Sequence, residues 1–476
     1  MEVTQSNMEM IQIPREEYEQ LKEENKILKE LIASLTKKIT ELDARLNKNS
    51  KNSNNPPSSD GSKKGAVKNS RVASGKKSGG QLEHEGKTIE LTPSPDTIIE
   101  LKPKTKCECG GEITIKADEY TKRQVTDIEP AKVVTIEYRA HDGECVQCGQ
   151  IHKAGFPENV EGTVSYGEKL HTFVTYLTNY QLLPLKRATE LLEDVFGIRM
   201  SQGTIVSINQ EAYEKLEEAE AVIKEGVINS DVVHFDESGM RVCGTNQWLH
   251  SASTQDSTVY SIHEKRGREA MDDMGILPNF RGTAIHDHWK SYYCYDQCAH
   301  GECNAHHIRH LIYLYEDLGA GWANEMLTLL LRVERHVELS RLFGADCLMQ
   351  EDIEAYEKIY REILTNAAAT QEKPAVSVEI KRMINRLTKY EQETLLFMYD
   401  FSVPFTNNLS ERDIRMPKAK QKISGGFRSA GGAKAFARTR GYISTVKKRG
   451  INILEGLDAV FRGGALKFLS QKPIST

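Results

Sequence analysis

The 476-residue sequence contains no apolar run of the length that a membrane span requires. Its first residues, MEVTQSNMEM, also lack the charged and then apolar pattern of a secretory signal peptide. These absences predict a cytosolic protein with no membrane partner. Thiols stay reduced in that compartment, so close pairs among the nine cysteines are expected to bind metal rather than to form disulfides.

A large net charge is also missing, and the formal value of −5 at pH 7 does not by itself indicate a nucleic-acid-binding protein. The charges are segregated, however. Residues 61–80 contain basic residues and no acidic one, and residues 412–449 are similarly rich in lysine and arginine. Such blocks favour contact with a polyanion, although solvated linkers have the same composition.

The clearest local element covers residues 15–47, in which leucine recurs every seven residues. A second, mostly apolar set follows each leucine by four positions and includes Asn25, Ile32 and Ile39. This heptad pattern predicts a parallel, dimerising coiled coil whose register is fixed by Asn25. One amphipathic helix packed on a globular core is the alternative.

Residues 48–82 are rich in asparagine, serine, glycine and lysine. A segment of this composition cannot bury enough apolar surface to fold. We expect a flexible basic linker that contacts DNA phosphates without sequence preference.

Residues 83–160 contain two close cysteine pairs, separated by alternating stretches such as AKVVTIEYRA that are typical of strands. The cysteines are Cys107, Cys109, Cys145 and Cys148. Four thiolates at the tips of two turns can close one structural Zn²⁺ site, and a glycine after each pair suits the tight backbone. The segment therefore predicts a small β-rich zinc-binding module, with a β-unit carrying incidental thiols as the alternative.

Residues 165–226 have helical periodicity. One helix ends at a turn formed by residues 196–198, and Ser201 caps the next. This spacing is typical of a helix-turn-helix, although many helical hairpins bind no DNA.

After Gly226 the pattern changes to strands. DVVHFDES ends near Asp236, QWLHSAS and STVYSIH follow, and RGTAIHDHWKSYY has a strand that stops at Asp287. This order predicts the beginning of an RNase H-like sheet with the two aspartates on neighbouring strands. Carboxylates at that distance repel each other unless a hard cation such as Mg²⁺ lies between them. Glu237 should point to the opposite side of its strand.

The stretch NNLSERDIRMPKAKQKISGGFRS, residues 407–429, is expected to begin as a helix. Asn408, Glu411 and Arg415 then share one face. Glu411 can complete a three-carboxylate site for Mg²⁺ or Mn²⁺, and Arg415 can meet a phosphate. An ion pair between Glu411 and Arg415 is the alternative.

Five stretches carry a resemblance to a known family: HFDESGMRV, AIHDHWKSYY, CNAHHIRHL, the 407–429 stretch and ARTRGYISTVKKRGINILEGL. Together they resemble the transposases of the insertion sequence 66 group, within the DDE superfamily. The resemblance covers essentially the whole chain, and it implies that Asp236, Asp287 and Glu411 are the catalytic acids. It also implies a supporting role for Cys303 and His306, which match a Cys-x-x-His signature.

The same resemblance completes the expected architecture, a multidomain α+β chain. An RNase H-like α/β core covers residues 228–430 with an all-α insertion at about 318–400, and a basic helical region covers 431–476. The residues expected to contact DNA are Arg412, Arg415, Lys418, Lys420, Lys422, Arg428, Arg438, Arg440, Lys447 and Lys448. For His286 and His288, which flank Asp287, we expect packed or hydrogen-bonded roles. A second zinc site at Cys294, Cys298, Cys303 and His306 is an alternative.

We therefore expect a bacterial insertion-sequence transposase that is cytoplasmic and associates with the nucleoid when bound to DNA. It would cleave DNA at the element's ends with Mg²⁺ and join the freed 3′-hydroxyl to target DNA. Its expected partners are both DNAs, a second copy or more of the chain, and accessory transposition proteins. The alternatives are a non-catalytic or accessory-dependent zinc-containing DNA-binding protein and a nuclease without strand transfer.

Overall fold

The computed structural model describes residues 14–46, 91–104, 106, 108–113, 121–127, 133–157, 160, 162–369 and 378–470. Across these residues the architecture is mixed α and β, as expected from the sequence. None of the helices in this part of the chain is long and apolar enough to cross a membrane.

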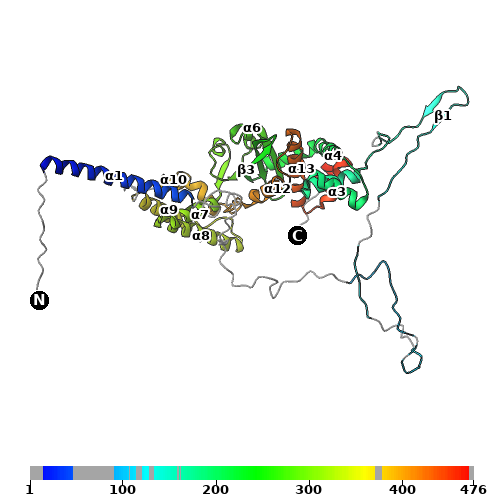
Figure 1. Cartoon of the computed structure of the whole chain (residues 1–476), viewed down its shortest axis with the longest axis horizontal. Coiled ribbons are helices and arrows are strands. Elements are labelled where there is room, and N and C mark those ends of the chain that lie inside the picture. Colours follow the sequence, from blue (N-terminus) through cyan, green and yellow to red (C-terminus); the bar gives the residue numbers. More distant parts are fainter. Residues whose placement is uncertain are drawn as a thin grey trace.

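A five-stranded mixed sheet forms the centre of the molecule (Figure 1). Its strands, in spatial order, are β5 (Thr258–His263), β4 (Thr245–Ser253), β3 (Val232–Val242), β6 (Thr283–His286) and β7 (Ala299–Glu302). The first three form an antiparallel meander, whereas β6 is parallel to β3 and β7 is parallel to β6.

The expected strands are present, with one correction and one omission. Strand β3 does not end near Asp236, because its pairing with β4 continues to Val242. There the chain reverses through Cys243 and Gly244, both at positive φ, as a two-residue hairpin turn of this kind requires. Strand β7 was not expected, because its sequence AHGE has neither a β-branched nor an aromatic residue.

Helices cover the sheet, and a further group of helices lies beyond one end of it. Helix α12 (Asn408–Ser424) packs on β3 and β4, while α13 (Ala430–Lys448) and α5 (Glu217–Ile228) pack on β5. The helices expected between residues 318 and 400 are present, and they share a buried core around Leu330, Tyr360 and Met383. They are α8 (Gly321–Leu342), α9 (Gln350–Ala369), α10 (Val378–Lys389) and α11 (Glu391–Tyr399), preceded by α7 (Asn304–Glu316).

A further helical unit lies before the sheet and includes α2 (Glu168–Thr175), α3 (Leu185–Phe196) and α4 (Gln202–Lys215). The expected turn is present: Gly197 has a left-handed backbone, and the Ser201 hydroxyl accepts the Thr204 N–H at 3.0 Å. Helix α14 (Ile453–Phe461) returns to this unit and buries Phe461 in its core, and α15 (Ala465–Leu469) follows. The C-terminal helices therefore pack on earlier parts of the chain.

The N-terminal helix is a single long rod (Figure 1). Helix α1 (Arg15–Leu46) is present as expected, and heptad residues such as Leu28 and Ile32 are exposed, at 53% and 61%. The linker at 48–82 lies outside the described residues, and residues 133–140, expected as a strand, form none.

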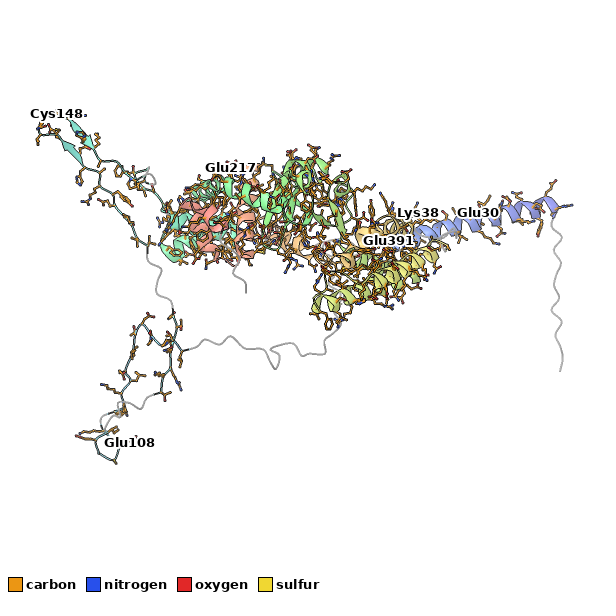
Figure 2. All side chains as sticks on the ribbon, turned by 180° about the vertical axis from the view of Figure 1, so that it is seen from behind. Glu30, Lys38, Glu108, Cys148, Glu217 and Glu391 are labelled. Atoms are coloured by element: carbon orange, nitrogen blue, oxygen red, sulfur yellow. The ribbon has the colours of Figure 1, made fainter. Side chains whose placement is uncertain are left out.

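The hairpin β1 (Asp142–Glu144) and β2 (Ile151–Lys153) carries Cys145 and Cys148 in its turn. The glycines after the cysteine pairs, Gly110 and Gly149, both have positive φ, as the tight turns were expected to need. Figure 2 shows Glu108, which precedes Cys109, well away from Cys148, and the described cysteines Cys109, Cys145 and Cys148 do not form a metal-ligand group. Cys107 itself lies outside the described residues.

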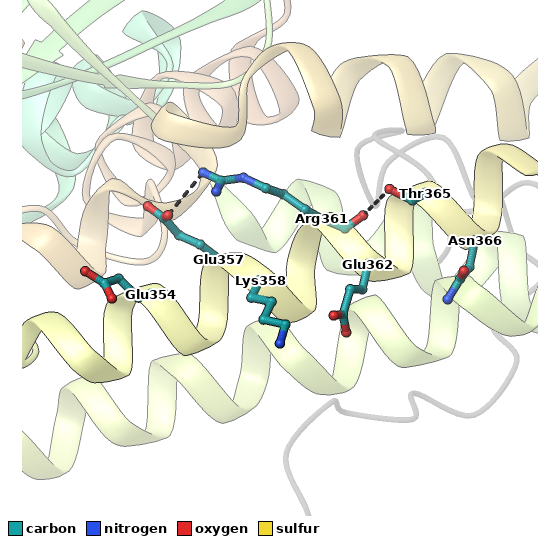
Figure 3. Close-up of a pocket in the computed structure, with 7 residues that line it drawn as sticks. All are labelled: Glu354, Glu357, Lys358, Arg361, Glu362, Thr365 and Asn366. Carbon is teal, nitrogen blue, oxygen red and sulfur yellow. Dashed lines mark hydrogen bonds and ion pairs between the residues drawn. The ribbon is translucent and has the colours of Figure 1, made fainter.

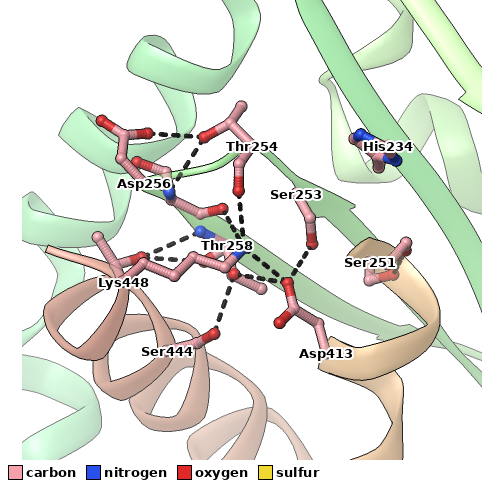
Figure 4. A network of polar contacts seen from close by, with 12 residues as sticks. His234, Ser251, Ser253, Thr254, Asp256, Thr258, Asp413, Ser444 and Lys448 are labelled. Carbon is pink, nitrogen blue, oxygen red and sulfur yellow. Dashed lines mark hydrogen bonds and ion pairs between the residues drawn. The ribbon is translucent and has the colours of Figure 1, made fainter. Parts of the chain in front are cut away.

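A buried polar network joins α12 and α13 to the meander (Figure 4). The Lys448 ammonium donates to the Asp413 carboxylate at 2.7 Å, and Ser253 and Thr258 donate to the same oxygen at 2.7 and 3.0 Å. The side chains of Asp413 and Lys448 are each only 12% exposed. Burial lowers the pKa of Lys448, and Asp413 opposes that shift. The ion pair therefore holds together segments that are far apart in the sequence.

We expect Asp413→Asn to destabilise the protein by about 2–4 kcal/mol, because the buried Lys448 loses its carboxylate partner. The matched control is Asp458→Asn, which removes a solvent-exposed pair with Arg462 and should cost less than about 1 kcal/mol. Urea unfolding followed by tryptophan fluorescence measures both. Equal costs for the two variants would contradict a structural role for the buried pair.

Candidate active site

Asp236 and Asp287 come from neighbouring parallel strands. Residue His234 of β3 is paired with Ile285 of β6, and two positions further along the same register bring Asp236 level with Asp287, just past the end of β6. Neighbouring strands lie about 4.8 Å apart. The structure therefore places Asp236 on β3 and Asp287 directly after the end of the neighbouring strand β6.

Glu411 is brought to the same region by the start of α12. The preceding residue Asn407 is 2% exposed, and its amide donates to the Phe235 carbonyl at 2.7 Å and meets His234 Nδ1 at 2.8 Å. The backbone N–H of Glu411 then bonds to the Asn407 carbonyl at 3.2 Å. Asn407 thus fixes the first turn of α12 against the strand that carries Asp236.

Sequence reasoning placed Asn408 on the face of α12 that carries Glu411, and it did not identify the role of the adjacent Asn407. Asn408 is exposed, whereas Asn407 is buried and makes the contacts to β3. Arg415, two turns into α12, is exposed as well. A helix start was recognisable from the sequence, but spacing alone does not determine which of the two amides faces the sheet.

The three acids influence one another electrostatically. Burial raises the pKa of Asp236 well above its usual range, and the carboxylates of Glu237, Asp287 and Glu411 add to that shift. Burial also raises the pKa of Asp287 to about 7, again with a contribution from Glu237. The side-chain oxygens of Asp236, Asp287 and Glu411 do not all lie within 4.8 Å of one another.

Glu237 is buried and paired. Arg266 donates to one of its oxygens at 2.9 and 2.7 Å, and the Tyr292 hydroxyl donates to the other at 2.6 Å. Arg266 also lies over the rings of Trp248 and Trp289, at 4.9 and 3.9 Å from their centroids. These contacts give Glu237 a structural role beneath the acids, and its Arg266 partner lowers the pKa of Asp287.

Cys303 and His306 lie next to Glu411. The donor atoms of these three residues are all within 4.8 Å of one another. The Cys303 sulfur accepts the Asn407 N–H at 3.1 Å, and burial raises the pKa of this thiol to about 12. Burial lowers the pKa of His306 well below its usual range, which favours the neutral imidazole.

Arg309 was not predicted, although it follows His306 by one turn of α7. Its guanidinium lies 3.6 Å from the Glu411 carboxylate. The CNAHHIRHL stretch contained the signal, because residues three apart share a helix face. Arg309 therefore supplies a positive charge beside the carboxylate of Glu411.

A second group of metal-ligand side chains lies close by. The donor atoms of His288, Glu302 and His307 are also within 4.8 Å of one another. The set considered from the sequence, Cys294, Cys298, Cys303 and His306, does not form such a group in the part of the chain that the structure describes.

The predicted DNA-contacting residues divide into two groups. Arg412, Arg415, Lys422, Arg428 and Lys447 are exposed.

The other predicted cations contact protein. Arg438 pairs with Glu220 and lies over Tyr213, Arg440 donates to the Asn179 carbonyl, and Lys448 pairs with Asp413. Lys418 donates to the Gly239 carbonyl, and burial lowers the pKa of Lys420 to about 8. These interactions stabilise the fold and leave little of each cation for phosphate.

A surface pocket on α9 is lined mainly by charged side chains (Figure 3). Glu354, Glu357 and Glu362 line it together with Lys358 and Arg361, and Arg361 is paired with Glu357 and Glu391. The balance is acidic, so this pocket is a poor site for a phosphate group.

Comparison with known families identifies the central part of the chain. A model described as the transposase IS66 family matches residues 163–435, more than half of the sequence and all three acids. A model of a family of unknown function, DUF6444, matches residues 6–90. Comparison with curated proteins finds no match.

Asp287→Asn is expected to stabilise metal-free protein at pH 8 by about 1–3 kcal/mol. The raised pKa of Asp287 means that its folded carboxylate is costly once ionised. The cost is absent below the unfolded pKa near 4, grows between pH 4 and 7, and is complete above 7. Urea unfolding at pH 5 and pH 8 measures it. If Asp287→Asn stabilised the protein more at pH 5 than at pH 8, the raised pKa of Asp287 would be contradicted.

Proposed function

The chain belongs to the IS66 transposase family, and we propose that it cleaves DNA at the ends of an insertion sequence and joins them to target DNA. The observation that carries the proposal is the convergence of Asp236 on β3, Asp287 after the end of β6 and Glu411 on α12, within electrostatic reach of one another. The family itself implies a transposase role with DNA as its partner.

The sheet supports an RNase H-like core across residues 228–430. An antiparallel meander is followed by two strands parallel to its first member, in the order β5-β4-β3-β6-β7. The acids then lie on the first strand of this series, directly after the fourth strand, and on a helix that follows the sheet. Helices α8 to α11 form the insertion between the second and third acids.

The residues present fit a hard divalent cation. Carboxylate oxygens are the ligands that Mg²⁺ and Mn²⁺ prefer, and the crowded acids that raise the pKa of Asp236 are stabilised by a nearby positive charge. Asp236, Asp287 and Glu411 would hold the ion. When bound, it lowers the pKa of an attacking water or hydroxyl and offsets charge on the phosphate oxygens.

The proposed chemistry consists of two exchanges of P–O bonds. Water first displaces the 3′-oxygen of the element's end, and the freed 3′-hydroxyl then displaces the 3′-oxygen of a target phosphodiester. Neither step needs a covalent protein intermediate, so the chain's task is to position and to neutralise charge. Arg309 and Arg415 supply positive charge beside Glu411, and the neutral His306 can hydrogen-bond a phosphate oxygen or the hydroxyl.

We assign the DNA surface to the exposed cations of α12 and the residues after it. Arg412, Arg415, Lys422, Arg428 and Lys447 are free to release counterions from DNA phosphates. The helix pair α3 and α4 remains a candidate helix-turn-helix, although Asn209 of α4 already accepts from Asn179 at 2.7 Å. Arg438, Arg440 and Lys448 are left out because they hold the fold together.

The N-terminal segments complete the proposal. The exposed heptad face of α1 fits a coiled-coil dimer, which suits a protein that must hold two DNA ends. We propose that Zn²⁺ joins Cys107 and Cys109 to Cys145 and Cys148 and folds residues 83–160. Backbone N–H groups of Cys148 and Gln147 lower the pKa of Cys145, as a metal-binding turn requires. Accessory transposition proteins are further proposed partners.

We expect Asp236→Asn, Asp287→Asn and Glu411→Gln each to abolish cleavage and joining while DNA binding survives. Each change removes a charged metal ligand and preserves the side chain's shape. The assay incubates labelled DNA carrying the element's ends with Mg²⁺ and follows cut and joined products. The control Glu269→Gln changes an exposed carboxylate on α6 (Arg268–Met274) and should leave activity intact.

Loss of DNA binding in all three variants would overturn the assignment of the acids to a metal site. Cutting without joining would indicate a nuclease. If the unaltered chain binds DNA but does not cut it, the assay is repeated with accessory proteins added. If the chain is still inactive, a non-catalytic DNA-binding protein is favoured.

Replacing Arg415, Lys422 and Arg428 together with glutamine should weaken binding of any duplex and reduce the slope of log affinity against log salt by about 2–3. With each phosphate contact that is lost, fewer counterions are released from the DNA on binding. Fluorescence anisotropy over a range of salt concentrations measures the slope. Lys358→Gln, in the acidic pocket of α9, is the matched control, and an equal effect from it would contradict the proposed surface.

A further inference from the structure

Three side chains with metal-binding donors meet in the interior beside the acids, and none of them belongs to the proposed carboxylate site. His288 follows Asp287, Glu302 ends β7, and His307 lies in the first turn of α7. Their side chains are 6%, 0% and 0% exposed. Glu302 Oε2 lies 2.5 Å from His307 Nε2 and 3.6 Å from His288 Nδ1.

Hydrogen bonds within the protein satisfy Glu302 but leave three ring nitrogens of this cluster without a partner. Tyr293 donates to the other Glu302 oxygen at 2.5 Å, and His307 Nε2 contacts Oε2. The 3.6 Å from His288 Nδ1 to Oε2 is too long for a hydrogen bond. Both ring nitrogens of His288 and Nδ1 of His307 are buried without a hydrogen-bond partner in the described structure. Each such atom costs about 1–3 kcal/mol.

We propose that His288, Glu302 and His307 bind a zinc ion, separate from the proposed carboxylate and cysteine sites. Two imidazoles and one carboxylate form a ligand set that zinc uses in proteins. Mg²⁺ fits poorly here, because imidazole suits transition metals and oxygen ligands suit Mg²⁺. Ligand atoms at about 2.0–2.1 Å from a tetrahedral ion lie about 3.4 Å apart. The 3.6 Å between His288 and Glu302 already matches this, and His307 must move back by about 1 Å.

The site has a positioning consequence. Its ligands come from the segment after β6, the end of β7 and the start of α7, so a bound ion ties these three segments together. Each histidine ligand adjoins a residue of the candidate active site, since His288 follows Asp287 and His307 follows His306. The ion would thus hold one acid and one supporting residue in place without contacting DNA. The inference does not depend on the proposed transposase chemistry, because its readout is metal binding.

The test uses the full chain with Cys145→Ser and Cys148→Ser. These changes remove the proposed thiolate site, so that it does not contribute to the number of metal ions bound. The chelator-treated protein is titrated with Co²⁺ in excess Mg²⁺, and visible absorption is recorded. One Co²⁺ per chain is expected to bind tightly, to show the bands of nitrogen and oxygen ligation, and to be displaced by Zn²⁺. Adding His307→Gln should abolish these bands, whereas adding His310→Gln, on the same helix, should leave them unchanged.

The proposal is overturned if no tightly bound ion is found, or if a folded His307→Gln protein retains it. A thiolate-to-cobalt charge-transfer band would also overturn it, because the ion would then lie on Cys303 or another cysteine. If His307→Gln fails to fold by circular dichroism, X-ray absorption of the zinc-loaded parent decides. A shell with two imidazoles supports the proposal, and an oxygen-only shell overturns it.

Discussion

The buried amide of Asn407 is the contact on which the candidate site depends. Its bonds to the Phe235 carbonyl and to His234 join α12 to β3, and its backbone N–H meets Cys303. The acids it helps to align are 51 and 124 residues apart in sequence (287 − 236 and 411 − 287). Their like charges oppose this approach, since each raises the pKa of Asp236. A buried amide whose nitrogen and oxygen are both hydrogen-bonded provides directional interactions that apolar packing alone lacks.

The long segment between the second and third acids can be accommodated because it folds around its own apolar core. Helices α7 to α11 bury Leu330, Tyr360 and Met383 among themselves, while Phe397 and Phe405 pack edge to face at 4.8 Å near the return to α12. Arg341 donates to the Phe401 carbonyl in the same region. The insertion therefore delivers Glu411 as the end of a packed unit, and the sheet does not have to restrain a long loop.

Local patterns predicted the parts of this protein that local sequence determines. Apolar runs ending in acids identified β3 and β6, and turn glycines and Ser201 identified the helix pair before the sheet. Strand β7 was missed because AHGE pairs only through its neighbours, and β3 was cut short because its polar second half gains order from β4. Asn407 and Arg309 were missed because their roles come from contacts across the fold. The three acids were selected as candidates by the sequence that flanks each of them, whereas their relative geometry depends on the tertiary fold.

Burial divides the basic residues that were predicted to contact DNA. Within residues 412–449 some cations satisfy buried acceptors, as Arg440 does for the Asn179 carbonyl and Lys448 does for Asp413. Moving such a cation to a phosphate would leave its buried partner unpaired, and for the Asp413 carboxylate this costs about 3–5 kcal/mol. Exposed neighbours such as Arg415 and Lys422 have no comparable cost. Cations that stabilise the fold and cations that are exposed to solvent thus alternate along one stretch of sequence, and only burial distinguishes them.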